Sequence, residues 1–243
     1  MSRANLIYDF EGRIRRELRN VETCDRVNGQ TIIKYHLQRV ADGISLARQH
    51  KCLCTLKQIS IMLGKQFRRA TKDDIVRLVA TIEQRPDFSA WTKRDYKIIL
   101  KLFYRWLYGY EKGDLPPLVK WIRTGYKIPN ELKKSDLLTM KEITKLVRAA
   151  ENPRDKALIL MLAESGRRLG EILTLRIEDV EFDKIGARLT VDGKMGQDYS
   201  RVIGCSRQLA AWLRIHPDRH NPKALLWVKH LDNRKQIKQM RYD

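Results

Sequence analysis

One stretch of this 243-residue sequence, residues 109–136, interrupts an otherwise helical pattern and divides the chain in two. The residues that punctuate it are Gly113, Pro116, Pro117, Gly125 and Pro129. Because proline removes a backbone donor and glycine disfavours helix, we expect a linker here, with only a short helix over residues 118–123. We therefore predict two domains, residues 1–130 and 135–243, with the linker at about residues 110–135.

Apolar periodicity predicts a helical bundle in the N-terminal domain. The expected helices cover residues 1–20, 31–50, 56–65, 70–84 and 89–109. Thr71 and Asp74 have the spacing of a capping box at the start of the fourth helix. Gly64 is placed to end the third helix. Residues 25–30 are predicted to form a turn between the first two helices.

The C-terminal domain combines helices with a strand pair. Helices are expected over residues 139–150, 153–164 and 206–215, and strands over residues 187–194, 199–205 and 224–228. Thr139 and Glu142 have capping-box spacing, and Asn152-Pro153 is a typical helix start. Because residues 157–163 are nearly all apolar, their helix is predicted to be a central core helix.

The charge is strongly basic, with a net value of +20. Such a balance favours a polyanionic partner, most simply nucleic acid. Residues 1–134 carry 28 Lys and Arg against 14 Asp and Glu, whereas residues 135–243 carry 21 against 15. We therefore expect the N-terminal domain to make the main electrostatic contact. A well-solvated surface or an anionic-membrane binder is the alternative that charge alone leaves open.

A cationic ridge is predicted on the helix over residues 89–109. Its basic residues are Lys93, Arg94, Lys97, Lys101 and Arg105. The three lysines recur every four residues and so share one helix face, along which Asp95 is the acidic exception. We predict that this ridge binds DNA, with an ordinary solvated face as the alternative.

Residues 163–182, AESGRRLGEILTLRIEDVEF, place two arginines where a helix restarts. Ser165-Gly166 ends one helical pattern, Arg167 and Arg168 follow at once, and an apolar helix face comes next. A buried arginine is costly unless something pairs with it. An arginine beside a core is therefore expected to hold a partner.

The order helix, Gly, Arg, helix, acidic turn, strand, Gly-Lys turn, strand resembles the tyrosine recombinase (phage integrase) family. ESGRRLGEILTLRIEDVEF is similar to that family's first arginine box, commonly Thr-Gly-Leu-Arg-x-x-Glu-Leu followed by Leu-x-x-x-Asp-Ile/Val. The resemblance gives Arg168 the place of the invariant arginine and Glu171 that of the glutamate. VDGKMGQDYSRVIGCS resembles the hairpin that follows, whose Gly-Lys turn presents a catalytic lysine, here Lys194. The loop RIHPDRHNPKALLWV resembles archaeal members.

The resemblance implies a mainly α fold. An N-terminal helical, SAM-like core-binding domain is expected to precede the first part of an α+β catalytic domain with a small antiparallel sheet. The implied function is site-specific DNA recombination, in which strands are cut and rejoined through a phosphotyrosine. Its partners are double-stranded DNA and further protomers on paired sites, without a metal or other cofactor. The corresponding expectation is a cytoplasmic protein of an archaeal mobile element.

The residue types suit that chemistry. Arginine offers a fixed fork of donors to two phosphate oxygens, and a helix start adds unpaired N–H groups. Glu171 lies on the same helix face and is placed to brace Arg168. Lys194 is placed to protonate the leaving 5′ oxygen, and Arg201, across the hairpin, to contact phosphate or solvent. A neutralised surface arginine and a solvated turn lysine are the alternatives.

The family also requires a His-x-x-Arg box and a tyrosine nucleophile after the hairpin. The strings at His36–Arg39 and His216–Arg219 are interpreted as coincidences, since one precedes the arginine box and the other lies in a proline-containing loop. Tyr199, in the hairpin, and Tyr242 are not where the nucleophile belongs. We expect a chain truncated before the box and inactive alone. The alternative is a non-enzymatic DNA-binding protein, an integrase remnant or a competitor at attachment sites.

Other partners and sites are less favoured. The four cysteines lack zinc-ligand spacing and are expected to be free thiols. No apolar run has the length of a membrane span, so no membrane partner is expected. A basic RNA-associated protein is disfavoured because Phe103, Trp106 and Trp212 have core spacing rather than that of stacking platforms.

Overall fold

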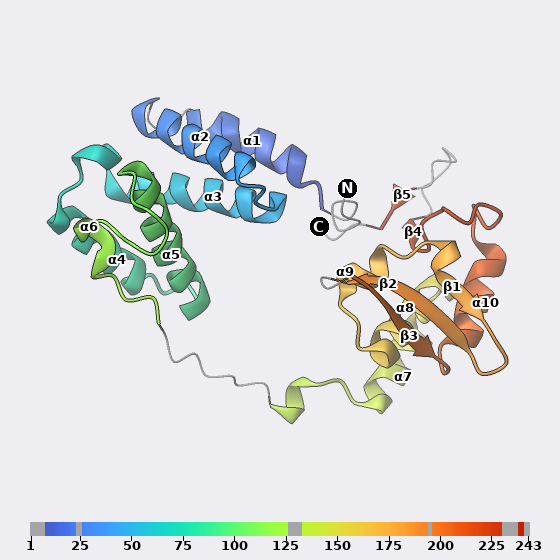
Figure 1. Ribbon diagram of the computed structural model, residues 1–243. Helices are drawn as coiled ribbons and strands as arrows, with labels where there is room; N and C mark the ends of the chain where they lie inside the picture. The colour runs from blue at the N-terminus through green and yellow to red at the C-terminus, as the bar shows by residue number, and fades with distance from the viewer. Residues whose placement is uncertain (1–7, 23–25, 126–132, 194–195, 230–237, 241–243) are drawn as a thin grey trace. The chain divides into compact units, whose positions relative to one another are not determined.

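The computed structural model describes residues 8–22, 26–125, 133–193, 196–229 and 238–240 (Figure 1). The chain forms two compact units. One is Phe10–Glu131, and the other combines Met1–Asp9 with Leu132–Asp243. Each unit has its own buried apolar core. The mainly α fold with a small antiparallel sheet, predicted from the sequence, is confirmed.

The first unit is a helical bundle. Its elements are α1 (Phe10–Glu22), α2 (Arg26–Ala41), α3 (Leu46–Leu63), the 3-10 turn η2 (Phe67–Arg69), α4 (Lys72–Gln84), α5 (Ala90–Leu107) and the short α6 (Pro117–Lys120). Buried aromatic rings from three of these elements meet in the core: Phe103 lies 5.4 Å from Tyr35 and 4.6 Å from Phe67 between ring centroids. Burying each ring contributes on the order of 2 kcal/mol, so the rings join α2, η2 and α5.

Local cap chemistry sets the helix ends. The Thr71 hydroxyl accepts a hydrogen bond from the backbone N–H of Asp74, and the Asp74 carboxylate accepts one from the Thr71 N–H. These reciprocal bonds satisfy donors that the first turn would leave unpaired. The Ser89 hydroxyl caps the start of α5 by accepting a hydrogen bond from the backbone N–H of Thr92. Gly64 ends α3 with φ at 64°, a conformation that other residues rarely adopt.

The sequence-based boundaries of α2 and α3 were wrong. The expected helix over residues 31–50 is broken at Asp42–Ser45, where Gly43 has a positive φ of 67°. The predicted turn at 25–30 instead lies mostly inside α2. A glycine is needed there, because a Cβ on Gly29 would lie 2.7 Å from the Val21 carbonyl oxygen. The Asn-Gly pair is therefore a helix-packing feature, not a turn.

The second unit packs helices against a three-stranded sheet. Its elements are η3 (Lys134–Asp136), α7 (Met140–Ala149), α8 (Pro153–Ser165), α9 (Leu169–Leu173), η4 (Ile177–Asp179), β1 (Val180–Phe182), β2 (Ala187–Gly193), β3 (Gly196–Val202), α10 (Ser206–Ile215), β4 (Val228–Lys229) and β5 (Lys238–Gln239). The sheet order is β1-β2-β3, antiparallel throughout (Figure 1). Helix α8 contacts α7, α10 and β3, so it lies at the centre of this unit.

Three details of this unit differ from the sequence prediction. Only Ala157 and Met161 of α8 are fully buried, whereas Leu158, Ile159, Leu160 and Leu162 are half-buried and Ala163 is exposed. Strand β1 was not predicted, because three residues are too few for a period. The strand expected over residues 224–228 is reduced to β4, preceded by an isolated bridge from Leu225 to Arg176.

Candidate active site

The break between α8 and α9 places two consecutive arginines at the surface. Helix α8 ends at Ser165, and Gly166 turns the chain with φ at 60°. Arg168 is the N-cap residue of α9. Because the first N–H groups of a helix have no partner within it, this position has positive potential. Both arginines are thus set beside one helix start, and they then take different partners.

Arg168 faces solvent and is held from behind by Glu171. Its side chain is 77% exposed, whereas that of Glu171 is 13% exposed. The guanidinium Nη1 donates to Glu171 Oε1 at 2.9 Å, and the Arg168 backbone N–H donates to Oε2 at 3.2 Å. The carboxylate therefore fixes one edge of the guanidinium and leaves the other donors open to a ligand.

Arg167 points to the hairpin instead. Its Nη1 forms an ion pair with Asp198 Oδ2 at 2.7 Å, and its Nη2 donates to the carbonyl oxygen of Tyr199 at 2.9 Å. The Arg167 side chain is 22% exposed. The hydrogen bond from Arg167 lowers the pKa of Asp198, helped by the Tyr199 N–H. The sequence analysis assigned no contact to Arg167, and the structure shows that it joins the α8–α9 break to β3.

The last residue of β2, Gly193, lies beside Glu171. Strands β2 and β3 pair up to Gly193 and Gly196, which face each other across the turn. A Cβ on Gly193 would lie 3.8 Å from Glu171 Oε1. Lys194, the predicted catalytic lysine, directly follows Gly193 and lies outside the described residues. Its role stays a prediction.

Glu164, which the sequence analysis did not single out, anchors the far end of β3. Its Oε1 accepts hydrogen bonds from the backbone N–H groups of Ile203 at 2.6 Å and Gly204 at 2.9 Å, and its Oε2 accepts one from Cys205 at 2.9 Å. Burial alone raises the pKa of Glu164, but these bonds outweigh it and the net pKa lies below its ordinary value. Gly204 lies against this carboxylate, since a Cβ on Gly204 would lie 3.4 Å from Glu164 Oε2.

The three lysines of the cationic ridge on α5 contact the protein's own acceptors. Lys97 is buried, and its Nζ pairs with Glu83 Oε1 at 2.7 Å. Lys93 donates to the Glu83 carbonyl oxygen at 2.5 Å, and Lys101 to that of Ile122 at 2.8 Å. Burial also lowers the pKa of Lys101. Lys97 would have to give up Glu83 to reach a phosphate.

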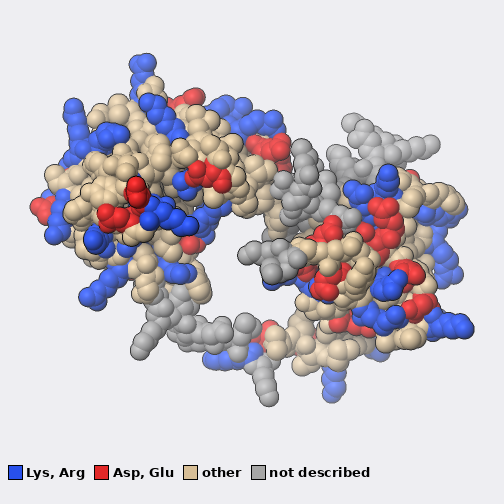
Figure 2. Space-filling view, in the orientation of Figure 1, with Lys and Arg blue, Asp and Glu red and all other residues tan. Residues whose placement is uncertain are grey.

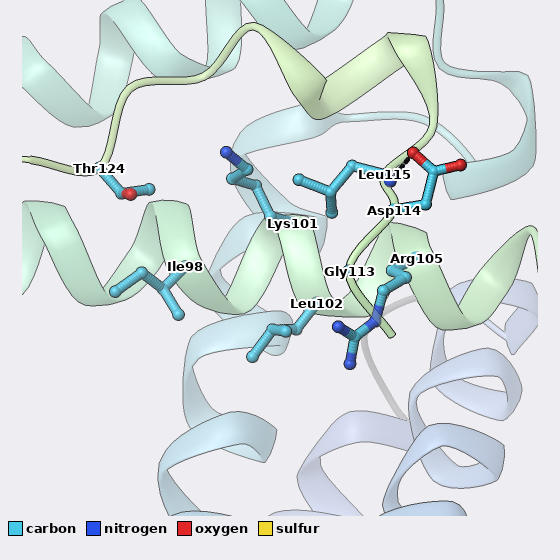
Figure 3. Close-up of a pocket in the computed structure, with 8 residues that line it drawn as sticks. All are labelled: Ile98, Lys101, Leu102, Arg105, Gly113, Asp114, Leu115 and Thr124. Carbon is cyan, nitrogen blue, oxygen red and sulfur yellow. Dashed lines mark hydrogen bonds between the residues drawn. The ribbon is translucent and has the colours of Figure 1, made fainter. Parts of the chain in front are cut away.

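The ridge's arginines have other surroundings. Arg94 donates to the Thr124 carbonyl oxygen at 3.3 Å and lies over the ring of Trp91. Arg105 and Lys101 line a shallow hollow of about 210 Å³, together with the loop that carries Asp114 (Figure 3). The other lining residues are Ile98, Leu102, Gly113, Leu115 and Thr124. The structure brings the ridge together along α5, and DNA binding by it stays a prediction.

Arg201 lies on β3, in the other unit, and is not part of the ridge. Its Nη1 pairs with Asp183 Oδ2 at 2.6 Å, and about 40% of its side chain is exposed. Figure 2 shows Lys and Arg spread over the visible face of each unit rather than gathered in one stripe. The predicted contact of Arg201 with phosphate likewise stays a prediction.

The His-x-x-Arg string at His216–Arg219 has structural partners. His216 is buried, its Nε2 lies 3.1 Å from the Leu225 carbonyl oxygen, and its ring packs against Trp212. Arg219 donates to the carbonyl oxygen of Arg214 at 2.9 Å. His36 is buried in α2 of the first unit. Within the second unit, His216 and Arg219 are thus held by α10 and by the chain at Leu225.

The described part of the chain was also compared with the requirements of a metal site and of a membrane-spanning helix. The described residues contain no group of three or more Cys, His, Asp or Glu side chains able to hold a metal ion. Within the same residues, no helix has both the length and the apolar character of a membrane span.

Comparison with solved structures defines the class of fold. The XerH site-specific recombinase bound to difH substrate, in its pre-cleavage complex, aligns with 97% of this chain and 74% of its own, with a TM-score of 0.54 and 15% identity. Its post-cleavage complex aligns over the same shares with a TM-score of 0.53 and 14% identity. At this identity the match shows the fold, which is that of a site-specific recombinase.

Sequence comparison then gives the family. Residues 136–242 match the phage integrase family. Tyrosine recombinase XerA of Pyrococcus horikoshii is 40% identical over 110 residues, and the match covers 45% of this chain and 37% of that protein. Transposase A from transposon Tn554 of Staphylococcus aureus is 37% identical over 51 residues, covering 20% of this chain and 14% of its own. Residues 136–242 thus form a domain of the phage integrase family, and the chain spans just over a third of the Pyrococcus protein that it matches.

Proposed function

We propose that this chain is a site-specific recombinase of the integrase type that binds double-stranded DNA and holds a phosphate with Arg168. The observation that carries this proposal is the unequal Arg168–Glu171 pair, an exposed guanidinium fixed by a nearly buried carboxylate. An arginine with such backing is pre-organised, so a phosphate gains two charge-assisted hydrogen bonds at little ordering cost. Its place in the family's arginine box supports the same role.

The chemistry follows from charge. When a tyrosine hydroxyl attacks the scissile phosphorus, it gives its proton to a base, the new O–P bond forms, the P–O5′ bond breaks and negative charge builds on the phosphate oxygens. Arg168 neutralises that charge, and the N–H groups at the start of α9 add to it. A proton must reach the leaving 5′ oxygen, and the family's motif assigns this step to Lys194. No metal ion and no nucleotide cofactor is needed in this scheme.

The helical unit is proposed to make the main contact with DNA. Residues 1–134 carry twice as many basic as acidic residues, 28 against 14. Such a surface releases counterions from DNA, so its affinity falls steeply with salt. In its finer form, the proposal is that the chain is an archaeal-type integrase from a mobile element. It would act as several protomers on paired DNA sites.

A second candidate function is DNA binding without catalysis, as an integrase remnant or a competitor at attachment sites. The observation that favours it is the position of Tyr199, whose carbonyl oxygen is bound by Arg167 and whose ring lies beside Arg188. A tyrosine in the middle of β3 is not placed as this family's nucleophile is. In this candidate the chain binds DNA and holds a phosphate with Arg168 without cutting the strand.

Trapping a covalent adduct on a nicked suicide duplex tests the two candidates. The chain would be incubated with the duplex alone and with the C-terminal half of a tyrosine recombinase relative supplied in trans. An adduct in either mixture that is lost in Arg168→Ala supports the recombinase. DNA binding without an adduct in either mixture contradicts it and supports the non-enzymatic candidate.

A further inference from the structure

Arg167 occupies the position of the family's arginine box where a leucine commonly stands, and it makes the closer contacts of the two arginines. The chain passes from Glu164 to Arg168 within five residues, and three side chains of this segment have different targets. Glu164 binds the backbone at residues 203–205, Arg167 binds β3 at Asp198 and Tyr199, and Arg168 faces solvent. The α8–α9 break therefore holds β3 at two places while presenting Arg168.

The contact at Asp198 requires an arginine. One nitrogen of the guanidinium pairs with the carboxylate at 2.7 Å while another donates to the Tyr199 carbonyl oxygen at 2.9 Å. A planar fork makes two such bonds at once, whereas a lysine ammonium on a flexible stem is a single point charge. Two bonds to adjacent residues of one strand fix both the position and the tilt of β3.

The position of β3 decides what lies next to Glu171. Asp198 pairs with Val191 across the sheet, only two residue pairs from Gly193 and Gly196. Gly193 in turn has its side-chain position 3.8 Å from Glu171 Oε1. A shift of the hairpin would thus change the surroundings of the carboxylate that holds Arg168.

We propose that Arg167 is a positioning residue that sets the β2–β3 hairpin against the Arg168–Glu171 pair and so keeps Arg168 aimed at a DNA phosphate. The second half of this statement rests on the proposed function. Glu164 holds the end of β3 independently, so loss of the Arg167 contact loosens the hairpin locally and leaves the unit folded. Arg167 acts through Glu171 and Arg168 and touches no DNA in this scheme.

Hydrogen exchange tests the structural half. In the free full chain, amide exchange would be followed in the peptide over residues 196–202 for wild type, Arg167→Met, Asp198→Asn and the double variant. We expect exchange to quicken by on the order of threefold in Arg167→Met and by less in Asp198→Asn, which keeps the bond to the Tyr199 carbonyl oxygen. The double variant should exchange no faster than Arg167→Met, because Asp198→Asn removes part of the same contact. Arg167→Lys, which keeps the ion pair alone, should fall between. Unchanged exchange, or additive effects, overturns the proposal.

A matched control lies on the same sheet. Arg188 on β2 pairs with Glu181 at the surface and lies over the ring of Tyr199, so Arg188→Met removes an equal charge and one side-chain contact to β3 but leaves both Arg167 bonds in place. We expect its exchange over residues 196–202 to equal that of wild type. An equal rise in both variants would show that any lost cation loosens β3, which overturns the specific role of Arg167.

Arginine footprinting tests the functional half. Phenylglyoxal modification of Arg168 would be measured with and without a duplex of random sequence, each variant being brought to the same fractional saturation. We expect DNA to protect Arg168 in wild type and in Arg188→Met, and to protect it on the order of threefold less in Arg167→Met, with partial rescue in Arg167→Lys. Full protection in Arg167→Met overturns the positioning role. Absence of protection in the saturated wild type contradicts the phosphate role of Arg168 itself, which distinguishes the two failures.

Discussion

Arg168 and Glu171 form an ion pair of 2.9 Å in which the acid is nearly buried and the base is open to solvent. The pair is therefore asymmetric. Glu171 also accepts from the Arg168 backbone N–H at 3.2 Å, so its carboxylate is tied to the helix start whether or not the guanidinium stays. The carboxylate belongs to the scaffold, and the guanidinium is the part that is free to take an anion.

Glu171→Gln separates positioning from charge. The variant adds one positive charge to the site, so a simple electrostatic contact predicts tighter binding to DNA. If Glu171 orients Arg168, the variant should instead lower the yield of covalent adduct by about tenfold while general affinity rises slightly. Anisotropy and adduct trapping on the same samples measure the two quantities. An adduct yield that rises with affinity would contradict the orienting role.

Glu164→Gln should destabilise the second unit in a pH-dependent way. The variant keeps the shape of the acceptor but loses the charge that receives three backbone N–H bonds, and we expect a loss of about 1–2 kcal/mol, since the group is partly solvated. Because the folded pKa of Glu164 lies below its ordinary value of 4.5, its contribution is present above that pH and is lost as the pH falls through the folded pKa. Urea midpoints of both proteins from pH 7 to 3 should therefore converge at the acid end. A constant difference would contradict this account.

Asn28→Ala should destabilise the helical unit strongly. The buried Asn28 amide donates to Ser60 Oγ at 2.9 Å and to the Lys65 carbonyl oxygen at 3.0 Å, and its oxygen accepts from the Phe67 N–H at 2.9 Å. Removing the Asn28 amide leaves these buried groups without their hydrogen-bond partner, which we expect to lower the free energy of unfolding by about 2–4 kcal/mol. Thermal unfolding measures the loss. Gln30→Ala, at an exposed position of the same helix, is the control and should change stability little.

Lys97→Met and Arg105→Met should differ in their effect on DNA binding. Lys97 is buried against Glu83, whereas Arg105 lines the hollow beside α6. We expect Lys97→Met to leave affinity within about twofold and Arg105→Met to weaken it several-fold at low salt, as a phosphate contact would. Anisotropy at one salt concentration measures both. Equal losses would show that Lys97 leaves Glu83 to bind DNA.

The sequence predicted those features that local chemistry controls. The capping boxes at Thr71 and Thr139, the proline start at Pro153 and the αL glycine at Gly64 all follow from backbone groups within one turn. The helix over residues 206–215 was predicted with the bounds that the structure has. The arginine box was found because it is a short contiguous pattern.

Long-range contacts could not be predicted in the same way. Glu164 and Arg167 reach partners 31 to 41 residues away, and nothing in their own neighbourhood indicates those partners. The bond between Lys97 and Glu83 is hidden for a similar reason, since a lysine ladder on a helix has the same spacing whether it faces solvent or a neighbouring helix. Periodicity shows which face a residue is on, and packing decides what that face meets.

The salt dependence of duplex binding tests the central claim, that Arg168 holds a DNA phosphate, most directly. Affinity would be measured by anisotropy between 50 and 200 mM salt for the full chain, Arg168→Ala and Arg188→Ala. We expect steep, linear log–log plots, with the slope of Arg168→Ala reduced by about one and that of Arg188→Ala close to wild type. A slope for Arg168→Ala equal to that of wild type, or no binding at 50 mM salt, would contradict the account.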